Sequence, residues 1–593
     1  MKKINYLVLF LVAFNLSCSQ ESTSVDPKKA LALNFAKDDK SISIEELMKD
    51  KGLKGLSVAV FEDYKIIWKD HWGVKYDSVP LNEETSFSTA SISKAITGLL
   101  FAILEEKGVF DLDIPVNTYL KRWKIPQNEF NKDTPVTLVH LLSHTAGTSQ
   151  HGFTDFYEGE KIPSILESIQ GKLPRYDKEI EVTFTPGTDW KYSGGGYTIA
   201  MMALEDHLGK SLADLAQEYI FGPLNLKNTT MKQPNEEGFL TNVAKAHDNK
   251  GNIIKTGIPI TPQVSASGMW SNPTDMSILM IEIQKALEGK SEIFSKKVAE
   301  RITTIITRKG IGGWCIGFDR FQAFGNLDWF SHGGANTGIG GHIYGTMKEG
   351  KGIVFFGNGP NGIRVPILDE LRSNIIETHG WKKPFDKSKL EELPTTLEEQ
   401  VVGRYEHVGW GLNEIQKKEG KLVLVLGRDF ELFYLGDYTF GIDEIPFKMK
   451  FNIKENGEHE VEQFWDNSSE KLFMQRKVLG KLPFELAQEN KYEEALAAYK
   501  KLKKENPNSS LVSESRINSF GYEHLGDKKY DVAITIFKIN TILYPDSANT
   551  YDSLGEAYLL SGDKKNALKY YKKTLELNPN NSNAVKVVKD LSE

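Results

Sequence analysis

The sequence predicts three folded units in succession: a domain that mixes strands and helices, a small all-β domain, and an α-helical repeat solenoid. Between about residues 42 and 378, apolar residues at helical spacing alternate with short strand patterns. From 397 to about 477, apolar and polar residues alternate in short runs separated by polar turns. From about residue 483 the pattern is helical, and its last two units keep a step of 34 residues.

Length and charge limit the classes of function. A chain of 593 residues is too long for one hydrophobic core, and its length favours about three or four domains. The apolar content of 40% and the charged content of 26% are ordinary for a soluble globular protein. The net charge of −7 and the lack of a basic patch argue against nucleic-acid binding.

The N-terminus is predicted to be a targeting segment. Lys2 and Lys3 precede an apolar run that is shorter than the roughly 20 residues needed to span a bilayer. Residues 1–18 are therefore predicted to be a signal peptide. Cys18 ends this segment and resembles the lipidated cysteine of a bacterial lipoprotein, which predicts lipidation at Cys18 and anchoring to a membrane. The alternative is an ordinary signal peptide with a chance cysteine.

The residues that follow suit a tether. Residues 19–41 are polar and charged, as a flexible connection to an anchor would be. Lipidation of Cys18 would leave Cys315 as a single cysteine, so we expect no disulfide framework.

The stretch from Ser91 to Leu104 is predicted to be a buried helix that ends before Gly108. Ser91 and Lys94, three residues apart in its first turn, would have side chains that face the same way. A desolvated lysine has a lowered pKa and can help to activate a serine hydroxyl as a nucleophile. The alternative is a helix-capping serine beside a lysine that reaches solvent.

Two further stretches before residue 150 predict structure. Residues 56–61 and 65–68 form the two strands of a hairpin. His140 and His144 lie four residues apart on a predicted helix, as metal ligands would. Because Leu141 stands where the zinc-protease pattern needs a glutamate, we interpret both as packing and hydrogen-bonding histidines.

Tyr192 precedes a glycine-rich entry to a helix predicted over 199–208. Its hydroxyl group could project from a loop into a cleft; the alternative is a core tyrosine with a backbone partner.

Three predicted strands close the domain, and the first ends in Ser331-His332-Gly333-Gly334. Glycines within a strand allow the backbone of a substrate to lie against its edge.

These segments resemble the serine β-lactamase and penicillin-binding-protein superfamily, in the class C branch that also holds D-aminopeptidases, D-Ala-D-Ala carboxypeptidases and esterases. The resemblance covers roughly residues 42–378, within a domain set at 42–380. It implies a β-lactamase/transpeptidase-like α/β (α+β) domain with an antiparallel sheet flanked by helices, and no metal or organic cofactor. It rests on three motifs and two supporting stretches: Ser91-Ile92-Ser93-Lys94, Tyr192-Ser193-Gly194, His332-Gly333-Gly334, 141–147 and 268–275.

The resemblance also implies catalytic roles. Ser91 would be the acylated nucleophile, and Lys94 would lower the barrier to removal of its proton. Tyr192 would exchange protons with Ser91 and the leaving group, first as a base and then as an acid. The backbone N–H groups of Ser91 and Ala335 would form the oxyanion hole.

The implied substrate-binding positions depart from the family pattern at two motifs. Gly194 replaces the asparagine of Tyr-x-Asn, and His332-Gly333-Gly334 replaces Lys-Thr-Gly. His332 would lie near the substrate's carboxylate or leaving group, where its protonation near neutral pH would tune the contact. Both changes remove groups that recognise β-lactams, so peptidase or esterase activity is expected before antibiotic hydrolysis.

After this domain, residues 381–396 are predicted to be a linker and 397–478 a small barrel or sandwich, similar to β-domains appended to some members of the family. Residues 483–593 resemble tetratricopeptide repeats, in which paired helices stack. The 34-residue step runs from Ala533 to Ala567. A concave face of the stack would bind a peptide or protein; the alternatives are a structural cap or a dimer contact.

Together these patterns predict an exported, membrane-anchored lipoprotein, periplasmic or at the cell surface, that acts as a serine hydrolase through an acyl-enzyme on Ser91. Its substrates would be D-amino-acid peptides or small esters, without a cofactor and without nucleic acid. One alternative is a β-lactamase proper. The other is a penicillin-binding-type sensor or scaffold that recruits partners through its repeats.

Overall fold

The computed structural model describes most of the chain after the predicted tether. The predicted signal peptide, Cys18 and the tether lie outside the described residues. The described ranges are 42–173, 178–309, 312–382, 387–407, 411–425, 429–442, 445–454, 459–465, 471–478, 480–507, 509–579 and 581–592.

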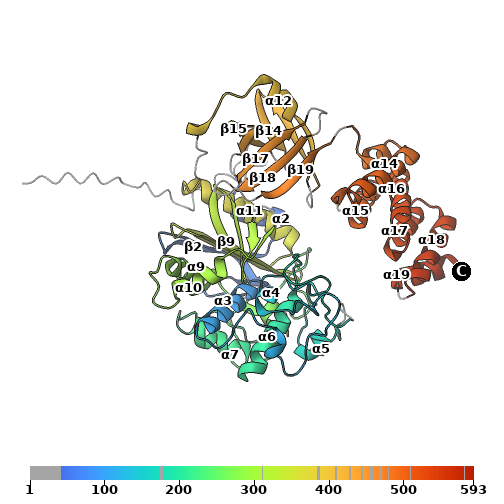
Figure 1. Ribbon diagram of the computed structural model, residues 1–593. Coiled ribbons are helices and arrows are strands. Elements are labelled where there is room, and N and C mark those ends of the chain that lie inside the picture. The colour runs from blue at the N-terminus through green and yellow to red at the C-terminus, as the bar shows by residue number, and fades with distance from the viewer. Residues whose placement is uncertain are drawn as a thin grey trace, which may run out of the picture.

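One antiparallel sheet forms the centre of the first domain (Figure 1). Its strand order is β3-β2-β1-β11-β10-β9-β8-β7-β6, so the first strands of the domain pair with its last strands. A separate small sheet pairs β4 (Phe87–Ala90) with β5 (Met269–Ser271). The strands of the large sheet are β1 (Gly55–Glu62), β2 (Lys65–Tyr76), β3 (Val79–Pro80), β6 (Thr307–Lys309), β7 (Gly312–Trp314), β8 (Asp319–Ala323), β9 (Leu327–Asn336), β10 (Ile339–Thr346) and β11 (Gly352–Gly357).

Helices cover both faces of this sheet, and each face has its own core. On one face, α2 and α11 pack against Trp329 and Phe355. On the other, a larger core joins the remaining helices to Phe330 and Phe356. The helices are α2 (Ile44–Lys51), α3 (Ser93–Glu106), η1 (Val116–Thr118), α4 (Leu138–Leu142), α5 (Ile165–Ile169), α6 (Gly194–Leu208), α7 (Leu212–Ala216), η2 (Gln217–Phe221), α8 (Val264–Ser267), α9 (Pro273–Leu287), α10 (Lys296–Thr303) and α11 (Asn361–Thr378).

The α3 helix is buried along most of its length, as its apolar spacing predicts. Every residue from Ser93 to Leu104 is buried, and the chain leaves the helix at Gly108 with φ of +71°. A Cβ atom on Gly98 would lie 2.7 Å from the carbonyl oxygen of Ile316, so this glycine lets α3 contact the turn between β7 and β8. The close contact fixes α3, and with it Lys94, against the sheet.

Three local predictions are wrong in detail. Ser91 is not in the first turn of the helix but in the turn before it, because α3 begins at Ser93. The helix that contains His140 ends at Leu142, so His144 lies beyond it with φ of +63°. The two histidines therefore do not share a helical face. The glycine-rich segment after Tyr192 is itself helical, since α6 begins at Gly194.

The second unit is a closed antiparallel barrel in which the first and last strands pair. The helix α12 (Thr395–Val401) precedes it and contributes Leu397 and Val401 to its core. The described part of the segment between the two units also holds η3 (Lys387–Lys389). The strands are β12 (Gly403–His407), β13 (Gly411–Lys418), β14 (Lys421–Val425), β15 (Asp429–Tyr434), β16 (Thr439–Ile442), β17 (Ile445–Ile453), β18 (His459–Trp465) and β19 (Lys471–Lys477).

The third unit is a stack of paired helices. A Cβ on Gly521 would touch the ring of Phe537, and 34 residues later a Cβ on Gly555 would touch Tyr571. The repeated step thus preserves one close helix–helix contact. The helices are α13 (Pro483–Gln488), α14 (Tyr492–Glu505), η4 (Ser510–Val512), α15 (Glu514–Gly526), α16 (Tyr530–Leu543), α17 (Ala548–Leu560), α18 (Lys564–Leu577) and α19 (Ser582–Ser592).

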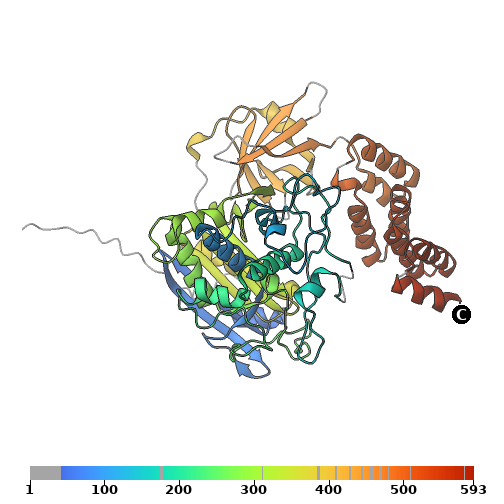
Figure 2. The ribbon, with the colours of Figure 1, turned by 60° about the horizontal axis from the view of Figure 1, so that its bottom comes forward.

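The predicted succession of a mixed α/β domain, a β-barrel and a helical repeat is confirmed. The barrel lies over the face of the first domain that carries α11, and the repeats extend to one side (Figures 1 and 2). Arg404 of the barrel donates a hydrogen bond of 2.6 Å to the carbonyl oxygen of Gly480, where the repeats begin. Within the described residues, every helix is too short or too polar to cross a membrane.

Candidate active site

Ser91 stands at a strained turn between β4 and α3. Ala90, directly before it, has φ of +50°, a value that residues with a side chain adopt only where neighbours hold them. Ser93 holds this turn: its hydroxyl group donates to the carbonyl oxygen of Ala90 at 2.6 Å and accepts from the N–H of Met269 at 2.8 Å. The turn thus presents Ser91, half-buried, at the start of the helix.

Lys94 is a buried amine beside the Ser91 hydroxyl. Its side chain is 2% exposed, and Nζ lies 3.1 Å from Ser91 Oγ. Nζ also donates to the carbonyl oxygen of Ala266 at 2.6 Å. Because burial removes water from the ammonium group, the pKa of Lys94 is lowered to about 7. Near neutral pH a large fraction of this amine is therefore uncharged and can accept a proton.

Tyr192 completes a compact group with these two residues. Its side chain is hydrogen-bonded to that of Ser91, and Lys94 Nζ lies 4.9 Å from the centre of its ring. Burial raises the pKa of Tyr192 further above its usual value of 10. The phenol therefore keeps its proton in the free site. The structure thus brings together Ser91, Lys94 and Tyr192, which the sequence singled out from segments about 100 residues apart.

His144 packs against the ring of Tyr192 and bonds to the backbone next to it. Its ring lies 4.2 Å from that of Tyr192, and its Nδ1 accepts the backbone N–H of Ser193 at 3.1 Å. Its carbonyl oxygen accepts the N–H of Lys191 at 2.9 Å. Burial lowers the pKa of His144 well below its usual value, so the ring is neutral. The packing and hydrogen-bonding interpretation of His144 fits this environment, whereas its contact with Tyr192 was not foreseen.

His332 is neutral, and its expected titration near neutral pH is wrong. Burial and the nearby charge of Lys94 lower the pKa of His332 to about 3. Nδ1 lies 2.7 Å from the carbonyl oxygen of Gly333 and donates to it when the ring is neutral, which leaves a lone pair on Nε2. This nitrogen is buried and has no hydrogen-bond partner among the described residues. His332 therefore offers an acceptor and no positive charge.

The free edge of β9 lies beside Ser91. The neighbouring strand β8 begins at Asp319, opposite Ser331, so the residues from His332 onward have no strand on that side. A Cβ on Gly334 would lie 1.9 Å from the carbonyl oxygen of Thr89 and 3.0 Å from the nitrogen of Ser91. Only a glycine permits this approach, which places the following peptide group, with the N–H of Ala335, next to Ser91.

Asn336 ties this edge to the floor of the site. Its Nδ2 donates to Ser88 Oγ, and its Oδ1 accepts from Ser267 Oγ, each at 2.8 Å. Since Ser88 is in β4, these bonds fix the end of β9 against the strand that leads to Ser91. Sequence reasoning did not single out Asn336, because the signal is a contact between residues about 250 positions apart in the chain.

Phe153 occupies the direction in which a side chain at position 194 would point. A Cβ on Gly194 would lie 2.6 Å from its ring. An asparagine here, as in the Tyr-x-Asn pattern, would therefore collide with an apolar side chain. The rings of His151 and Tyr192 lie 5.5 Å apart in the same region.

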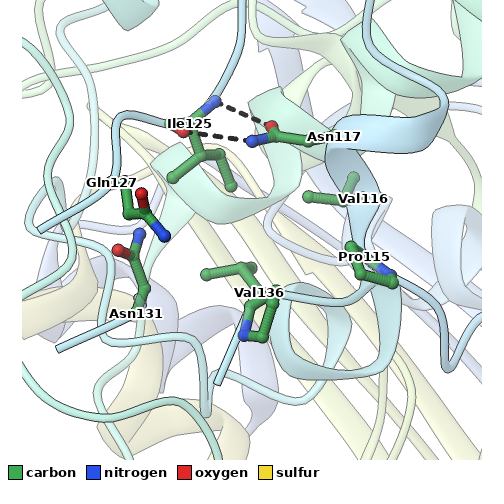
Figure 3. Close-up of a pocket in the computed structure, with 8 residues that line it drawn as sticks. Pro115, Val116, Asn117, Ile125, Gln127, Asn131 and Val136 are labelled. Carbon is green, nitrogen blue, oxygen red and sulfur yellow. Dashed lines mark hydrogen bonds between the residues drawn. The ribbon is translucent and has the colours of Figure 1, made fainter. Parts of the chain in front are cut away.

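Other parts of the domain supply less chemistry. The described residues contain no group of three or more histidine, cysteine or acidic side chains arranged to hold a metal ion. A cavity of about 350 Å³ beside η1, shown in Figure 3, is lined by side chains that carry no acid or base. Its wall is held by Asn117, whose amide pairs with the backbone of Ile125 through two hydrogen bonds. It offers no group for acyl transfer.

Comparison with known families gives three matches. The family model described as Beta-lactamase matches residues 43–373. Two models described as Tetratricopeptide repeat match residues 484–509 and 549–581.

Among curated proteins, the teichoic acid D-alanine hydrolase of Staphylococcus aureus is 26% identical over 282 residues, which is 46% of this chain and 64% of that protein. The protein flp of Staphylococcus aureus is 22% identical over 354 residues, 57% of this chain and 66% of its own length. The chain thus spans somewhat less than two thirds of each.

Among solved structures, the octameric penicillin-binding protein homologue from Pyrococcus abyssi has a TM-score of 0.48 at 20% identity, covering 73% of this chain and 98% of that chain. The hydrolase EstCE1, described as having promiscuous acyltransferase activity, has a TM-score of 0.47 at 18% identity, covering 56% and 96%.

We expect Lys94→Met to stabilise the fold. The unfolded chain binds a proton on Lys94 between about pH 7 and the usual pKa of 10.5, and the folded chain does not, so wild-type stability rises with pH across this window. The shift corresponds to on the order of 5 kcal/mol at pH 7, partly offset by the lost hydrogen bonds to Ser91 and Ala266.

Calorimetry between about pH 6 and pH 10 measures this effect. The gain in unfolding temperature should be largest at the acidic end and shrink as pH rises. Lys107→Met, at the exposed end of the same helix, should keep the wild-type pH dependence. A loss of stability in Lys94→Met at every pH would contradict the assignment of Lys94 as a destabilising buried amine.

Proposed function

The chain belongs to the beta-lactamase family through residues 43–373, and we propose that it is a serine hydrolase that acts through an acyl-enzyme on Ser91. The observation that carries this proposal is the 3.1 Å contact between Ser91 Oγ and a buried Lys94 with a pKa near 7. The alternative of a helix-capping serine beside a lysine that reaches solvent does not fit, because Lys94 is only 2% exposed. Burying an amine without an acidic partner is costly, and such groups concentrate at functional sites.

The two pKa shifts favour Lys94 as the first base, in place of Tyr192, to which the family resemblance gave that role. Ser91 Oγ attacks the acyl carbonyl carbon, and its proton passes to the neutral Nζ of Lys94. Tyr192 keeps its proton in the free site, so it gives that proton to the leaving group as the bond to the acyl carbon breaks. Lys94 then returns a proton to Tyr192. For deacylation, Tyr192 passes its proton to Lys94 and takes one from the water that attacks the acyl carbon. Lys94 then gives its proton to Ser91 Oγ as the ester bond breaks, which releases the acid and frees Ser91.

During the attack, negative charge develops on the carbonyl oxygen of the substrate, and two hydrogen-bond donors can stabilise it. The N–H of Ser91 lies in the turn before α3, and the N–H of Ala335 lies on the free edge of β9 beside it. We propose that these two groups form the oxyanion hole. The strand edge is open for the acyl group because the β8–β9 ladder ends at Ser331, and Gly334 allows the approach that sets the hole.

We propose that the preferred substrate is an ester of D-alanine or of a similar D-amino acid. A peptide with a free C-terminal carboxylate is the less favoured substrate. His332 stands at the position of the β-lactamase lysine but is neutral and offers a lone pair. Such a group accepts from an ammonium or hydroxyl donor and gives a carboxylate no charge to bind. The similarity to a teichoic acid D-alanine hydrolase agrees with this choice.

A β-lactamase proper is the less favoured enzyme. Its amide-binding asparagine is replaced by Gly194, and Phe153 fills the adjacent space. A substrate amide buried there would lose its partner, which reduces discrimination in favour of β-lactams. In the sensor or scaffold alternative, the protein would have the same fold and would recruit partners through its repeats, which have the architecture of protein-interaction modules. It would not turn over a substrate.

Ser91→Ala should abolish turnover of a p-nitrophenyl ester and labelling by a fluorophosphonate, with the fold unchanged. Intact-mass spectrometry of residues 19–593, with peptide mapping, locates the adduct. The matched control is Ser561→Ala, which removes the serine of a second Ser-x-x-Lys sequence in the turn between α17 and α18. Full activity of Ser91→Ala would sink the assignment.

The same experiment with a penicillin separates the alternatives. A fluorophosphonate adduct alone supports an esterase or peptidase, and adducts of both reagents move the function towards penicillin binding or β-lactam hydrolysis. No adduct from either reagent in folded protein would favour the sensor or scaffold.

The rate of acylation should rise with pH through about 7, since only the neutral amine of Lys94 accepts the proton of Ser91. Burst kinetics with p-nitrophenyl acetate between about pH 5 and pH 9 measure it. His332, with a pKa of about 3, should add no inflection in this range. A rate of acylation that is flat across the range would rule out Lys94 as the base.

We also propose that the chain is exported and anchored through a lipid on Cys18, on the support of its N-terminal sequence. Full-length protein from a bacterial host should partition into the detergent phase of a Triton X-114 extraction, and Cys18→Ser should move it to the aqueous phase. Cys315→Ser is the matched control and should stay with the detergent. Equal partitioning of Cys18→Ser and wild type would refute the anchor.

A further inference from the structure

Arg364 is a buried cation without an acidic partner. It lies in the first turn of α11 and is 1% exposed. Its Nη1 donates to the carbonyl oxygen of Gly359 at 2.7 Å, and its Nη2 donates to that of Gly334 at 3.2 Å and to the side chain of Asn361. No ion pair to Arg364 is present among the described residues. Burial lowers its pKa to about 10, so it stays charged at neutral pH.

A second arginine on the same helix shows what a structural role looks like. Arg372, two turns further along α11, is also buried, but it pairs with Asp369 at 2.9 Å and donates to the hydroxyl group of Tyr344 at 2.8 Å. Its guanidinium also lies 3.6 Å from the centre of the Phe324 ring. Among the described residues, the hydrogen-bond partners of Arg364 are neutral oxygens, which is a costly arrangement for a charge that serves packing alone.

The contact of Arg364 with Gly334 depends on a third residue, Gly340. A Cβ on Gly340 would lie 2.2 Å from the Gly334 oxygen and 2.8 Å from Arg364 Nη2. Any side chain at position 340 would therefore press between the guanidinium and the carbonyl group. Gly340, with φ of +156°, is directly paired with Ala335 in the ladder of β9 and β10.

The carbonyl group that Arg364 binds belongs to the same peptide unit as the N–H of Ala335. The described chain has no cis peptide bond, so the C=O of Gly334 and the N–H of Ala335 point in opposite directions. The C=O faces Arg364 and Gly340 on the β10 side. The N–H therefore points away from β10, toward the free edge of β9, while Gly334 itself packs against Thr89 and Ser91.

We propose that Arg364 is a positioning residue that polarises the Gly334–Ala335 peptide and so strengthens its N–H as an oxyanion donor. A cationic donor on the C=O draws electron density from the nitrogen, and hydrogen bonds in such a chain reinforce one another. The effect is strong because the guanidinium is desolvated and holds one fixed orientation. This inference rests on the proposed acyl transfer at Ser91.

The test compares Arg364→Met with the matched control Arg372→Met in the full chain. Acylation by p-nitrophenyl acetate should fall about tenfold in kcat/KM for Arg364→Met, less than the roughly 10²–10³-fold loss that follows removal of a whole oxyanion donor. The KM should change little. Arg364→Lys, which keeps the charge, should recover part of the rate. Arg372→Met should lower the unfolding temperature with little effect on kcat/KM.

A spectroscopic signature separates polarisation from a general loss of structure. A fluorophosphonate adduct on Ser91 places its phosphoryl oxygen in the oxyanion hole, and the ³¹P resonance of that adduct responds to the strength of the donors. The resonance should move in Arg364→Met and stay at the wild-type position in Arg372→Met. If Arg364→Met does not fold, the shift and rate of Arg364→Lys decide the question.

Two outcomes overturn the inference. One is a wild-type rate and ³¹P position in the Arg364 variant. The other is a loss of rate in the two methionine variants that simply follows their loss of stability. If wild-type enzyme forms no adduct and shows no turnover, the proposed function itself fails, which is a separate result.

Discussion

The desolvation of one amino group, that of Lys94, is the constraint on which the proposed chemistry of the first domain depends. An amine in water would stay charged and could not take a proton from Ser91 near neutral pH. The α3 helix therefore carries Lys94 into the core, and α8 supplies the carbonyl oxygen of Ala266 as its partner. Close contact at Gly98 leaves the helix little freedom to shift. Burial of this amine thus costs stability and gives the proposed base a pKa near neutrality.

Much of the fold follows from local sequence. The buried run after Ser91, the hairpin of β1 and β2, and the 34-residue step of the repeats are patterns within short windows, and the structure has all three. The wrong details lie at helix ends. His144 leaves the helix because the backbone turns to a positive φ that apolar periodicity does not encode, and Ser91 stands before α3 because Ala90 takes a strained conformation.

The candidate site likewise has features that the sequence predicts and features that it does not. Spacing alone brings Ser91 and Lys94 together, and the motif order adds Tyr192 and the edge of β9. What the sequence could not supply are properties set by distant neighbours. The neutrality of His332 comes from burial and the charge of Lys94, and the contact of Phe153 with Gly194 depends on a loop about 40 residues away. The Arg364 contact joins a helix to a strand edge and leaves no local pattern.

The open edge of β9 has a consequence for solubility. An unpaired strand is a template on which another chain can add by β-pairing, a common route to aggregation. Here the exposed stretch is short, its two glycines have low strand propensity, and Asn336 pins its end to Ser88. The features that let an acyl group reach Ser91 thus also deny a foreign strand the length it needs for stable pairing. Protection from self-association comes with the architecture of the site rather than from added charges or prolines.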